Sequence, residues 1–366
     1  MLITEVISDT NIGGAGVLLC SIVGELKNEF EFEVILPRGS RLFPKIPNGV
    51  KVTELQIAKD KSFCASDITT FYNHFRRRKP DILHTHAALT ARVAGKLSGI
   101  SVCLSTRHCS KPKDSLAKTS AVKKNLYNLC TDLTVSTADY ATDNLIAEGI
   151  PKSRIVTIKN GSFDLKKSKK TESTSVIEKL GLSEDCKIIG SVARLEKIKG
   201  QDLILRAAPE ILLHFPNTHF LFLGDGSMRE EYERLASNLG IERSVTFLGF
   251  VDNPEIYQRI FTVNVNASRG TETSCLATSE CLSLGIPTVA SDFGGNPEMV
   301  KDFENGFIFS SDNPHILSGI IIRLLKDNKL YSSLSVGARE SYVKHFSLDK
   351  MISEYRRLYK SLQYNL

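Results

Sequence analysis

The sequence predicts an α/β protein of two domains, each built on a parallel β-sheet covered by helices. At 366 residues the chain exceeds the usual size of one domain. Short apolar segments alternate with amphipathic stretches of helical period, which is the pattern of repeated βαβ units. A polar stretch at residues 164–175, rich in lysine and serine, separates two such series. We therefore expect a linker there, with the domain boundary near residue 165.

The apolar segments define the predicted strands. Residues 1–8 are too short and too acidic for a signal peptide and predict a first buried strand. The other predicted strands are 32–37, 81–86, 102–106, 132–137, 155–160, 187–193, 218–224, 245–250, 261–267 and 288–291. Residues 203–212 place apolar side chains on one helical face, and Pro209 among them should kink or split that helix. A last helical pattern covers residues 348–362.

Composition indicates a soluble protein from a reducing compartment. Hydrophobic residues make up 42% of the chain and charged residues 24%, as in globular domains. No apolar run approaches the length that spans a bilayer. The eight cysteines are scattered, mostly in apolar surroundings, and none forms a Cys-x-x-Cys pair. We therefore expect reduced thiols and a cytoplasmic protein.

The charge is divided unevenly along the chain. Residues 1–170 hold 26 Lys and Arg against 16 Asp and Glu, a net charge of +10, whereas the remainder holds 21 against 25, a net charge of −4. This division suggests that the first half meets an anionic partner. A nucleic acid is not indicated, because no recognisable nucleic-acid motif is present. Peripheral binding to an anionic membrane and a solvated helix remain the alternatives for five lysines: Lys111, Lys113, Lys118, Lys123 and Lys124.

Two glutamates flank a predicted loop-to-helix junction. Glu272 and Glu280 are eight residues apart, and Gly285 marks the helix end. Thr273 or Ser274 is suited to cap the helix start. The unpaired N–H groups of such a start form an anion site. With one carboxylate before that site and one beyond it, the arrangement suits a nucleotide-sugar, which has hydroxyls on both sides of a diphosphate.

Two cations follow the predicted strand 187–193. Arg194 stands at the end of the strand, and Lys199 stands just before the next helix. The carboxyl edge of a parallel sheet is where α/β folds bind ligands, and guanidinium and ammonium groups suit phosphate oxygens. The alternative is a solvated loop with ordinary surface cations.

The first domain offers a glycine turn and three histidines. Gly14 belongs to a glycine-rich turn that opens a helix, which suits either close approach to a ligand or a tight connection. The second strand ends without the acidic residue of a dinucleotide site, which counts against NAD. His108 ends a strand, where it suits a substrate hydroxyl or is simply a loop residue. His84 and His86 share one side of a strand, but no third metal ligand follows at suitable spacing, so no metal site is expected.

Six segments in this order resemble family 4 of the retaining glycosyltransferases. They are residues 7–15 (ISDTNIGGA), 81–86 (DILHTH), 160–161 (NG), 191–200 (SVARLEKIKG), 272–280 (ETSCLATSE) and 291–298 (SDFGGNPE). The resemblance covers nearly the whole chain. It implies the GT-B fold, in which two Rossmann-like domains face a central cleft. The implied domains are an acceptor domain at residues 1–165, a donor domain at 166–347 and a helix at 348–366 that crosses back to the first domain.

The same resemblance implies a role for each matching residue. Arg194 and Lys199 would neutralise the leaving diphosphate, and Glu272 would contact hydroxyls of the donor sugar. His108 and Gly14 would contact the donor from the first domain. The ribose and the phosphates would be held by Glu280 and by the amides of Ser274, Cys275 and Leu276. The chain departs from the family at Thr273–Ser274, where Gly-Phe is common, so Cβ atoms crowd that loop.

The resemblance thus implies a retaining, metal-independent hexosyltransferase without a cofactor. Its donor would be a nucleotide-diphosphate sugar, with UDP as the expected nucleotide. Its acceptor would be a glycan or a lipid-linked sugar, used in surface polysaccharide synthesis at the inner face of the cell membrane. The alternatives are another GT-B enzyme, such as a sugar-nucleotide epimerase, and a non-catalytic sugar-binding scaffold. The presence of Arg194, Lys199, Glu272 and Glu280 argues against the scaffold.

Overall fold

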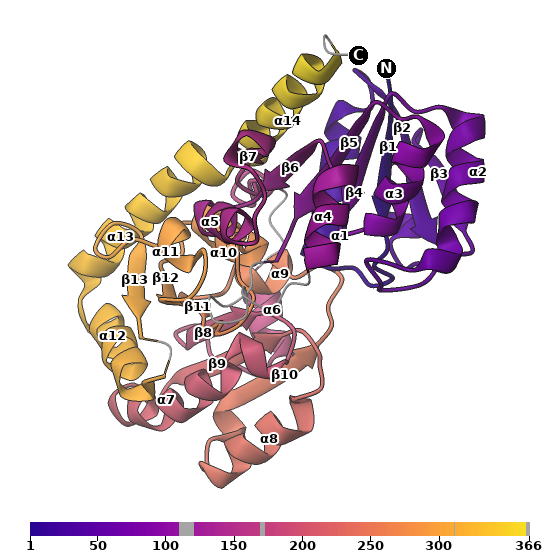
Figure 1. Cartoon of the computed structure of the whole chain (residues 1–366). Helices are drawn as coiled ribbons and strands as arrows, with labels where there is room; N and C mark the ends of the chain where they lie inside the picture. The colour runs from indigo at the N-terminus through magenta and orange to yellow at the C-terminus, as the bar shows by residue number, and fades with distance from the viewer. Residues whose placement is uncertain (110–120, 169–172, 311, 364–366) are drawn as a thin grey trace. The chain divides into compact units, whose positions relative to one another are not determined.

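The computed structural model describes residues 1–109, 121–168, 173–310 and 312–363 (Figure 1). It divides into two compact units. Unit 1 consists of Met1–Asn160 with Leu348–Leu366, and unit 2 consists of Gly161–Ser347. The chain therefore leaves unit 1 a few residues before the predicted boundary near residue 165, and it returns to unit 1 for its last helix.

Unit 1 contains a seven-stranded, fully parallel sheet in the order β3-β2-β1-β4-β5-β6-β7. The strands are β1 Leu2–Ile7, β2 Glu31–Pro37, β3 Lys51–Leu55, β4 Ile82–His86, β5 Val102–Arg107, β6 Leu133–Ser136 and β7 Ile155–Thr157. The helices are α1 Gly14–Leu26, α2 Ile68–Arg78, α3 Leu89–Ser98, α4 Ala121–Cys130, α5 Asp139–Ala147 and α14 Leu348–Gln363. Helices α1 and α14 share one core cluster with the sheet, and α2 and α3 share another.

Unit 2 contains a six-stranded, fully parallel sheet in the order β10-β9-β8-β11-β12-β13. The strands are β8 Lys187–Val192, β9 Thr218–Leu223, β10 Val245–Gly249, β11 Val263–Asn266, β12 Thr288–Ser291 and β13 Gly306–Phe309. The helices are α6 Ser173–Lys179, α7 Gln201–His214, α8 Arg229–Asn238, α9 Glu255–Gln258, α10 Leu276–Ser283, α11 Asn296–Met299, α12 Pro314–Lys326 and α13 Asn328–Ser341. A π-helical turn, Tyr342–Phe346, follows α13.

The predicted α/β fold with two parallel sheets is confirmed, and each predicted strand is present. Two strands were missed. β3 is only half-buried and carries charged residues, so it lacks a continuous apolar run. β13 is four residues long and begins with a glycine, which is too short for a periodicity signal. Both lie at sheet edges, where burial on the two faces is weakest.

Of the two effects expected of Pro209, a kink or a split of its helix, the split does not occur. Helix α7 runs without interruption from Gln201 to His214, with the proline inside it. A proline in a helix interior removes one hydrogen bond and costs about 3 kcal/mol. The residues on either side of it, Leu205, Ala208 and Ile211, are fully buried in the core of unit 2. Burial of that face outweighs the local preference for a break.

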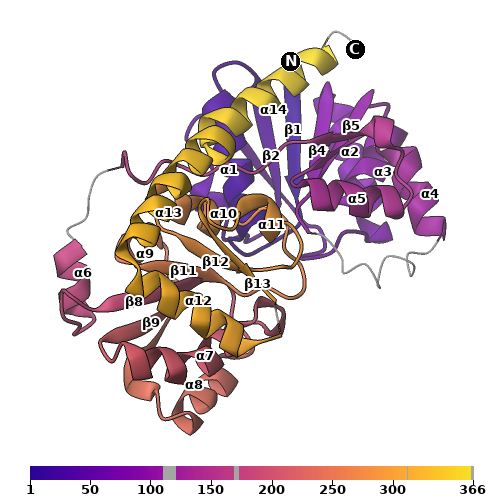
Figure 2. The same ribbon diagram turned by 90° about the vertical axis from the view of Figure 1, so that its left-hand side faces the viewer.

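Helix α14 completes the core of unit 1 although it is the last element of the chain. Its apolar face contributes six buried residues to the cluster that contains β1 and α1: Leu348, Met351, Ile352, Tyr355, Leu358 and Tyr359. Arg356 donates to Glu29, next to α1, at 2.7 Å. Met1 and Leu362 pack against the same cluster, so the two ends of unit 1 lie side by side (Figures 1 and 2).

The two segments at which the chain enters and leaves unit 2 are bonded to each other. The amide of Ser162 donates to the carbonyl of Phe346 at 3.0 Å, and the Tyr342 hydroxyl donates to the carbonyl of Ser162 at 2.8 Å. Ser279 on α10 joins them, because its hydroxyl donates to the carbonyl of Phe346 at 3.0 Å and lies 2.7 Å from that of Ser162. The entry and exit of the chain are therefore fixed to the helix that carries Glu280.

Two facts bear on contact with a membrane. Within the described residues, no helix combines the length and the apolar character needed to cross a bilayer. Lys111, Lys113 and Lys118, which were predicted to favour anionic lipid, lie outside the described residues. Membrane association therefore stays a prediction from charge alone.

Docking of α14 can be tested by truncating Met351, which is 1% exposed. Met351→Ala should lower the free energy of unfolding by about 2–4 kcal/mol, because it removes buried atoms and leaves a cavity. Thermal melting should fall by several degrees. Arg357→Ala, at an exposed position of the same helix, is the control. Equal melting temperatures for the two variants would contradict the docking of α14 into the core of unit 1.

Candidate functional site

A lysine and a glutamate lie side by side at the centre of the unit 2 sheet. β8 and β11 are neighbours, but the chain leaves them toward opposite sides of the sheet, which creates a crevice at their carboxyl ends. Lys199 follows β8, and Glu272 follows β11. The Lys199 Nζ lies 2.9 Å from Glu272 Oε2 and 3.4 Å from the carbonyl oxygen of Thr271. The pair that sequence reasoning assigned to one site therefore forms a largely buried ion pair.

Two glycines hold the loop that carries Glu272. The amide of Gly295 donates to the carbonyl of Glu272 at 3.3 Å. A Cβ atom on Gly295 would lie 1.7 Å from the carbonyl oxygen of Thr273. Gly294 has a φ of +64°, and a Cβ atom there would lie 2.3 Å from the carbonyl oxygen of Glu272. Larger residues cannot occupy these positions without moving the loop. Gly294 and Gly295 therefore lie against the backbone of the Glu272 loop.

An ion pair joins the two loops of the crevice. Arg269, in the loop after β11, donates to Asp202 Oδ2 on α7 at 3.0 Å, and its amide donates to the carbonyl of Ile198 at 2.7 Å. Ile198 and Asp202, which stand before and after Lys199 in the chain, are therefore both bonded to Arg269. Burial opposes its charged form, but the neighbouring Glu272 carboxylate outweighs burial and raises the pKa of the Lys199 ammonium. Lys199 is therefore held in its ammonium form within the ion pair.

Arg194 lies at the start of the same crevice loop and is exposed. Its carbonyl accepts a hydrogen bond from Gln201 Nε2 at 2.9 Å, which fixes its backbone. Among the residues that the structure describes, the Arg194 guanidinium has no hydrogen-bond or ion-pair partner. Since a guanidinium is always charged, this side chain is available to an anion that enters the crevice.

Helix α10 begins one residue later than expected, even if Ser274, the later of the two expected caps, is taken as the N-cap. Its N-cap is Cys275, without a side-chain hydrogen bond, so the prediction that Thr273 or Ser274 caps the helix is wrong. The Cys275 amide donates to Met299 Sδ at 3.2 Å. A thioether is a weak acceptor, and it takes the place of the expected hydroxyl cap. Gly285, with a φ of +75°, follows the helix as predicted.

Glu280 lies in the middle of α10 and is half-buried. Gln258 Nε2 donates to Glu280 Oε2 at 3.0 Å. Burial raises the pKa of Glu280 to about 7, and the hydrogen bond from Gln258 offsets only part of this effect. Glu280 therefore changes charge near neutral pH, and a hydroxyl donor that binds it would favour the carboxylate form.

Sequence reasoning missed the buried polar groups that support Glu272. Ser268 Oγ donates to Glu272 Oε2 at 2.9 Å, and the Ser268 carbonyl accepts from Ser291 Oγ at 2.5 Å. Asn296 Nδ2 donates to Ser291 Oγ, and Asn266 Nδ2 donates to Asn296 Oδ1, both at 3.0 Å. Each of these residues follows or ends a strand. A run of small polar residues after two apolar strands was the signal available in the sequence.

The remaining predicted residues belong to unit 1. Gly14 is the first residue of α1, after Gly13, which is the N-cap and makes no side-chain capping bond. His108 directly follows β5 and is half-buried. Its Nε2 lies 2.6 Å from His86 Nδ1. His86 Nε2 in turn lies 3.0 Å from Glu5 Oε2.

No third metal ligand follows His84 and His86 at suitable spacing in the sequence, but the structure places Glu5, from an earlier strand, beside both rings. Glu5 on β1 is paired in register with His84 on β4, so its carboxylate lies against both rings. Among the described residues this is the one set of three His, Cys, Asp or Glu side chains close enough to surround a metal ion. Hydrogen bonds at 2.7–3.0 Å engage these groups. We therefore treat the set as a hydrogen-bond network.

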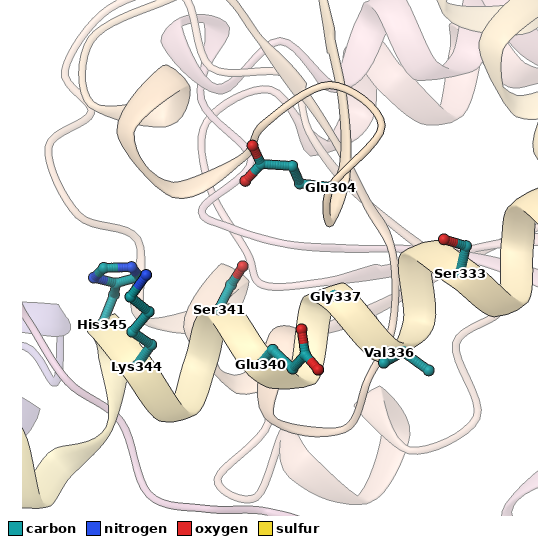
Figure 3. Close-up of a pocket in the computed structure, with 8 residues that line it drawn as sticks. All are labelled: Glu304, Ser333, Val336, Gly337, Glu340, Ser341, Lys344 and His345. Carbon is teal, nitrogen blue, oxygen red and sulfur yellow. The ribbon is translucent and has the colours of Figure 1, made fainter.

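A separate cavity of about 600 Å³ lies along α13. Figure 3 shows Glu304 on a loop facing Glu340, Lys344 and His345 across it. None of the residues predicted for the donor site lines this cavity. Its charged lining and open form give no ligand class, so it does not change the assignment of the site.

Two family models match successive parts of the chain. Residues 12–162 match Glycosyltransferase Family 4, and residues 172–341 match Glycosyl transferases group 1. The chain belongs to the family 4 glycosyltransferases. The second of these models covers the crevice residues Arg194, Lys199 and Glu272, and it also covers Glu280 on α10.

Relatives of this glycosyltransferase match it over much or all of its length. N-acetyl-alpha-D-glucosaminyl L-malate synthase of Bacillus anthracis is 25% identical over 95% of this chain and 94% of its own. A GDP-mannose-dependent alpha-(1-6)-phosphatidylinositol monomannoside mannosyltransferase of Mycolicibacterium smegmatis is 29% identical over 47% of this chain and 46% of its own.

A solved structure shares the fold of this glycosyltransferase. Alr3699/HepE of Anabaena in complex with UDP-glucose matches with a TM-score of 0.84 at 20% identity, covering 99% of this chain and 100% of the other. At this identity the likeness shows the GT-B fold alone.

The raised pKa of Glu280 predicts a pH-dependent stability. Between about pH 4.5 and pH 7 the folded protein holds a proton on Glu280 that the unfolded chain releases, so the free energy of unfolding should fall as the pH rises. Relative to Glu280→Gln, the wild type should lose about 1–3 kcal/mol across that window. Melting curves at several pH values measure the difference. Parallel pH profiles for wild type and Glu280→Gln would contradict the assignment, and Glu230→Gln, on the exposed side of α8, serves as the control.

Proposed function

We propose that this protein is a retaining hexosyltransferase that uses a nucleotide-diphosphate sugar. The observation that carries this proposal is the Lys199–Glu272 ion pair at the carboxyl ends of β8 and β11. The pair puts a fixed cation and a carboxylate side by side, with the exposed Arg194 on the same loop as Lys199. The two cations would bind the diphosphate, and the carboxylate would accept hydrogen bonds from hydroxyls of the sugar. One crevice of a glycosyltransferase would thus bind both parts of the donor.

The chemistry follows from where charge develops. Breaking the bond between the anomeric carbon and the diphosphate oxygen leaves the electron pair, and thus negative charge, on that oxygen. Arg194 and Lys199 would stabilise this charge, and Lys199 is suited to it because its pKa is raised and it stays an ammonium. The departing oxygen would take the proton of the acceptor hydroxyl while the acceptor oxygen bonds the same face of the carbon. The configuration is then retained.

The carboxylates and the residues of unit 1 would bind the donor. Glu272, oriented by Ser268 and Lys199, would accept hydrogen bonds from hydroxyls of the sugar. Glu280 would accept from the ribose. Gly14, His108 and the amides near the start of α10 keep the donor contacts that the family resemblance implies. The Cys275 amide would exchange its weak thioether acceptor for a phosphate oxygen.

UDP is the nucleotide that we propose. Support comes from the shared fold with Alr3699/HepE, which was solved with UDP-glucose. GDP is the second candidate, because the mycobacterial relative is GDP-mannose-dependent by name. A thermal-shift series with UDP, GDP and their glucose, mannose and N-acetylglucosamine conjugates separates the two. Stabilisation by neither nucleotide would contradict the proposed donor class.

The acceptor that we propose is a glycan or a lipid-linked sugar used in surface polysaccharide synthesis. The mycobacterial relative, named for a phosphatidylinositol mannoside, supports a lipid-linked acceptor. A small hydroxy acid is the second candidate, since the relative from Bacillus anthracis is named for joining a glucosamine unit to malate. Product analysis with each acceptor decides between them. The anomeric coupling constant of the product tests retention, and epimerised donor formed without acceptor would indicate an epimerase instead.

The proposed phosphate contact can be tested at Arg194. Arg194→Ala should raise the activation free energy by about 2–4 kcal/mol, because one preorganised positive charge is lost from the transition state. Melting should be unchanged, since the side chain is exposed. Steady-state kcat/KM measures the effect. Arg243→Ala is the control, because Arg243 precedes β10 and so lies at the opposite edge of the sheet. Normal turnover by a folded Arg194→Ala enzyme would refute the role.

We also propose that transfer needs no metal ion. The cations Arg194 and Lys199 would take the part that Mg²⁺ plays in other phosphate sites. Activity should therefore persist in excess EDTA at the rate measured before chelation. If chelation abolished turnover and Mn²⁺ or Mg²⁺ restored it, the proposed role of the two cations would be wrong.

A further inference from the structure

A buried glutamate in unit 1 is the acceptor for three donors. Glu5 is completely buried, and its Oε1 accepts from the Tyr359 hydroxyl at 2.8 Å and from His84 Nδ1 at 3.0 Å. Its Oε2 lies 3.0 Å from His86 Nε2. Burial alone would raise the pKa of this carboxyl, but its contacts with His84 and His86 outweigh burial and hold it well below its usual range. Glu5 is therefore a carboxylate and accepts at both oxygens.

Neighbouring strands and the last helix bring these groups together. Glu5 on β1 is paired with His84 on β4, and His86 on β4 is paired with Thr106 on β5. Tyr359 comes from α14, and its ring lies 6.0 Å from that of His84 in an edge-to-face arrangement. His108 stands two residues beyond Thr106, at the carboxyl edge of the sheet. The chain of contacts therefore runs from the core of unit 1 to that edge.

Counting protons assigns a tautomer to each ring. Glu5 has no proton to give, so His86 carries its hydrogen on Nε2. Burial lowers the pKa of His86, so the ring is neutral and its Nδ1 must accept. His108 Nε2, at 2.6 Å, is then the donor. The planes of the two rings are 16° apart and their centroids 4.9 Å apart, which fits nitrogens meeting edge to edge.

The contacts of His84, the other ring beside Glu5, also pair donors with acceptors. The hydrogen on His84 Nδ1 is shared between Glu5 Oε1 and the Tyr359 oxygen, at 3.0 and 2.8 Å. His84 Nε2 then accepts from the Thr106 hydroxyl at 2.7 Å. With the Glu5 carboxylate charged, each donor in these contacts meets an acceptor. An ion at this place would displace the protons that make these contacts.

We propose that Glu5 is a positioning residue that acts through His86 to hold His108 as its Nε2–H tautomer, so that His108 Nδ1 is a hydrogen-bond acceptor. This inference rests on the proposed function in one respect, the contact between His108 and a hydroxyl of the donor sugar. A sugar hydroxyl that binds Nδ1 then donates a hydrogen bond to this nitrogen. In the opposite tautomer Nδ1 would carry the hydrogen and donate, so the hydroxyl would have to accept with its oxygen. An acidic residue two strands away thus sets the polarity of that contact.

The test reads the tautomers directly. Long-range ¹H–¹⁵N NMR of the full chain, labelled at histidine, distinguishes Nδ1–H from Nε2–H rings, and His108→Gln assigns the signal. The wild type should show Nε2–H for His86 and His108. In Glu5→Gln the carboxamide keeps its oxygen toward Tyr359 and His84 and turns its NH₂ to His86. His86 and His108 should both change to Nδ1–H, and His84 should not.

Kinetics and a matched variant separate positioning from stability. Glu33→Gln is the control, because Glu33 is an equally buried glutamate of the same sheet that bonds Thr53 and Arg78 instead. It should leave the tautomers of His86 and His108 as in the wild type. Glu5→Gln should lower kcat about tenfold or more and change the Kd for UDP less than about twofold. Tyr359→Phe keeps the carboxylate and should keep the wild-type tautomers.

Three results would overturn the proposal. They are an Nδ1–H ring at His108 in the wild type, an unchanged His108 ring in folded Glu5→Gln, and zinc that copurifies in stoichiometric amount and broadens the His84 and His86 signals. The proposed function can fail separately. If no sugar is transferred from any donor but Glu5→Gln still inverts both tautomers, the network stands and the reaction must be reassigned.

Discussion

A parallel β-sheet sends every loop that follows a strand to the same edge, and both units are organised by that constraint. Where the chain reverses its direction of winding, two neighbouring loops separate and leave a crevice. In unit 2 the crevice lies between β8 and β11, and Lys199 and Glu272 meet there because each follows one of these strands. In unit 1 the corresponding neighbours are β1 and β4, which bring Glu5 against His84. Topology thus sets which polar side chains meet in each unit.

Much of this arrangement could be predicted because it is local. A strand buried on both faces leaves a continuous apolar run, and the residues just after the run must lie at the carboxyl edge. Arg194 and Lys199 follow such a run, and so does the loop of Glu272. The strands that escaped prediction, β3 and β13, are those without the run. Local chemistry also gave Gly285 its position after α10, since a left-handed residue was needed there.

What could not be predicted depends on contacts between distant segments. Glu5 and His84 are far apart in sequence, and only the pairing of β1 with β4 makes them neighbours. Pro209 remains helical because tertiary burial exceeds its local cost, and burial is not visible in a window of a few residues. The cap of α10 was misjudged for a similar reason. Met299, more than twenty residues later, supplies the acceptor that a local hydroxyl was expected to supply.

Helix α14 gives the chain an unusual order of assembly. The residues of β1 and α1 leave the ribosome long before residues 348–363, which cover the face that β1 and α1 share. Until residues 348–363 emerge, the nascent unit 1 exposes that apolar face and leaves Glu5 without the hydroxyl of Tyr359. Unit 2, whose segments are contiguous in sequence, has all its parts earlier. The domain that is synthesised first must therefore be the one that is finished last.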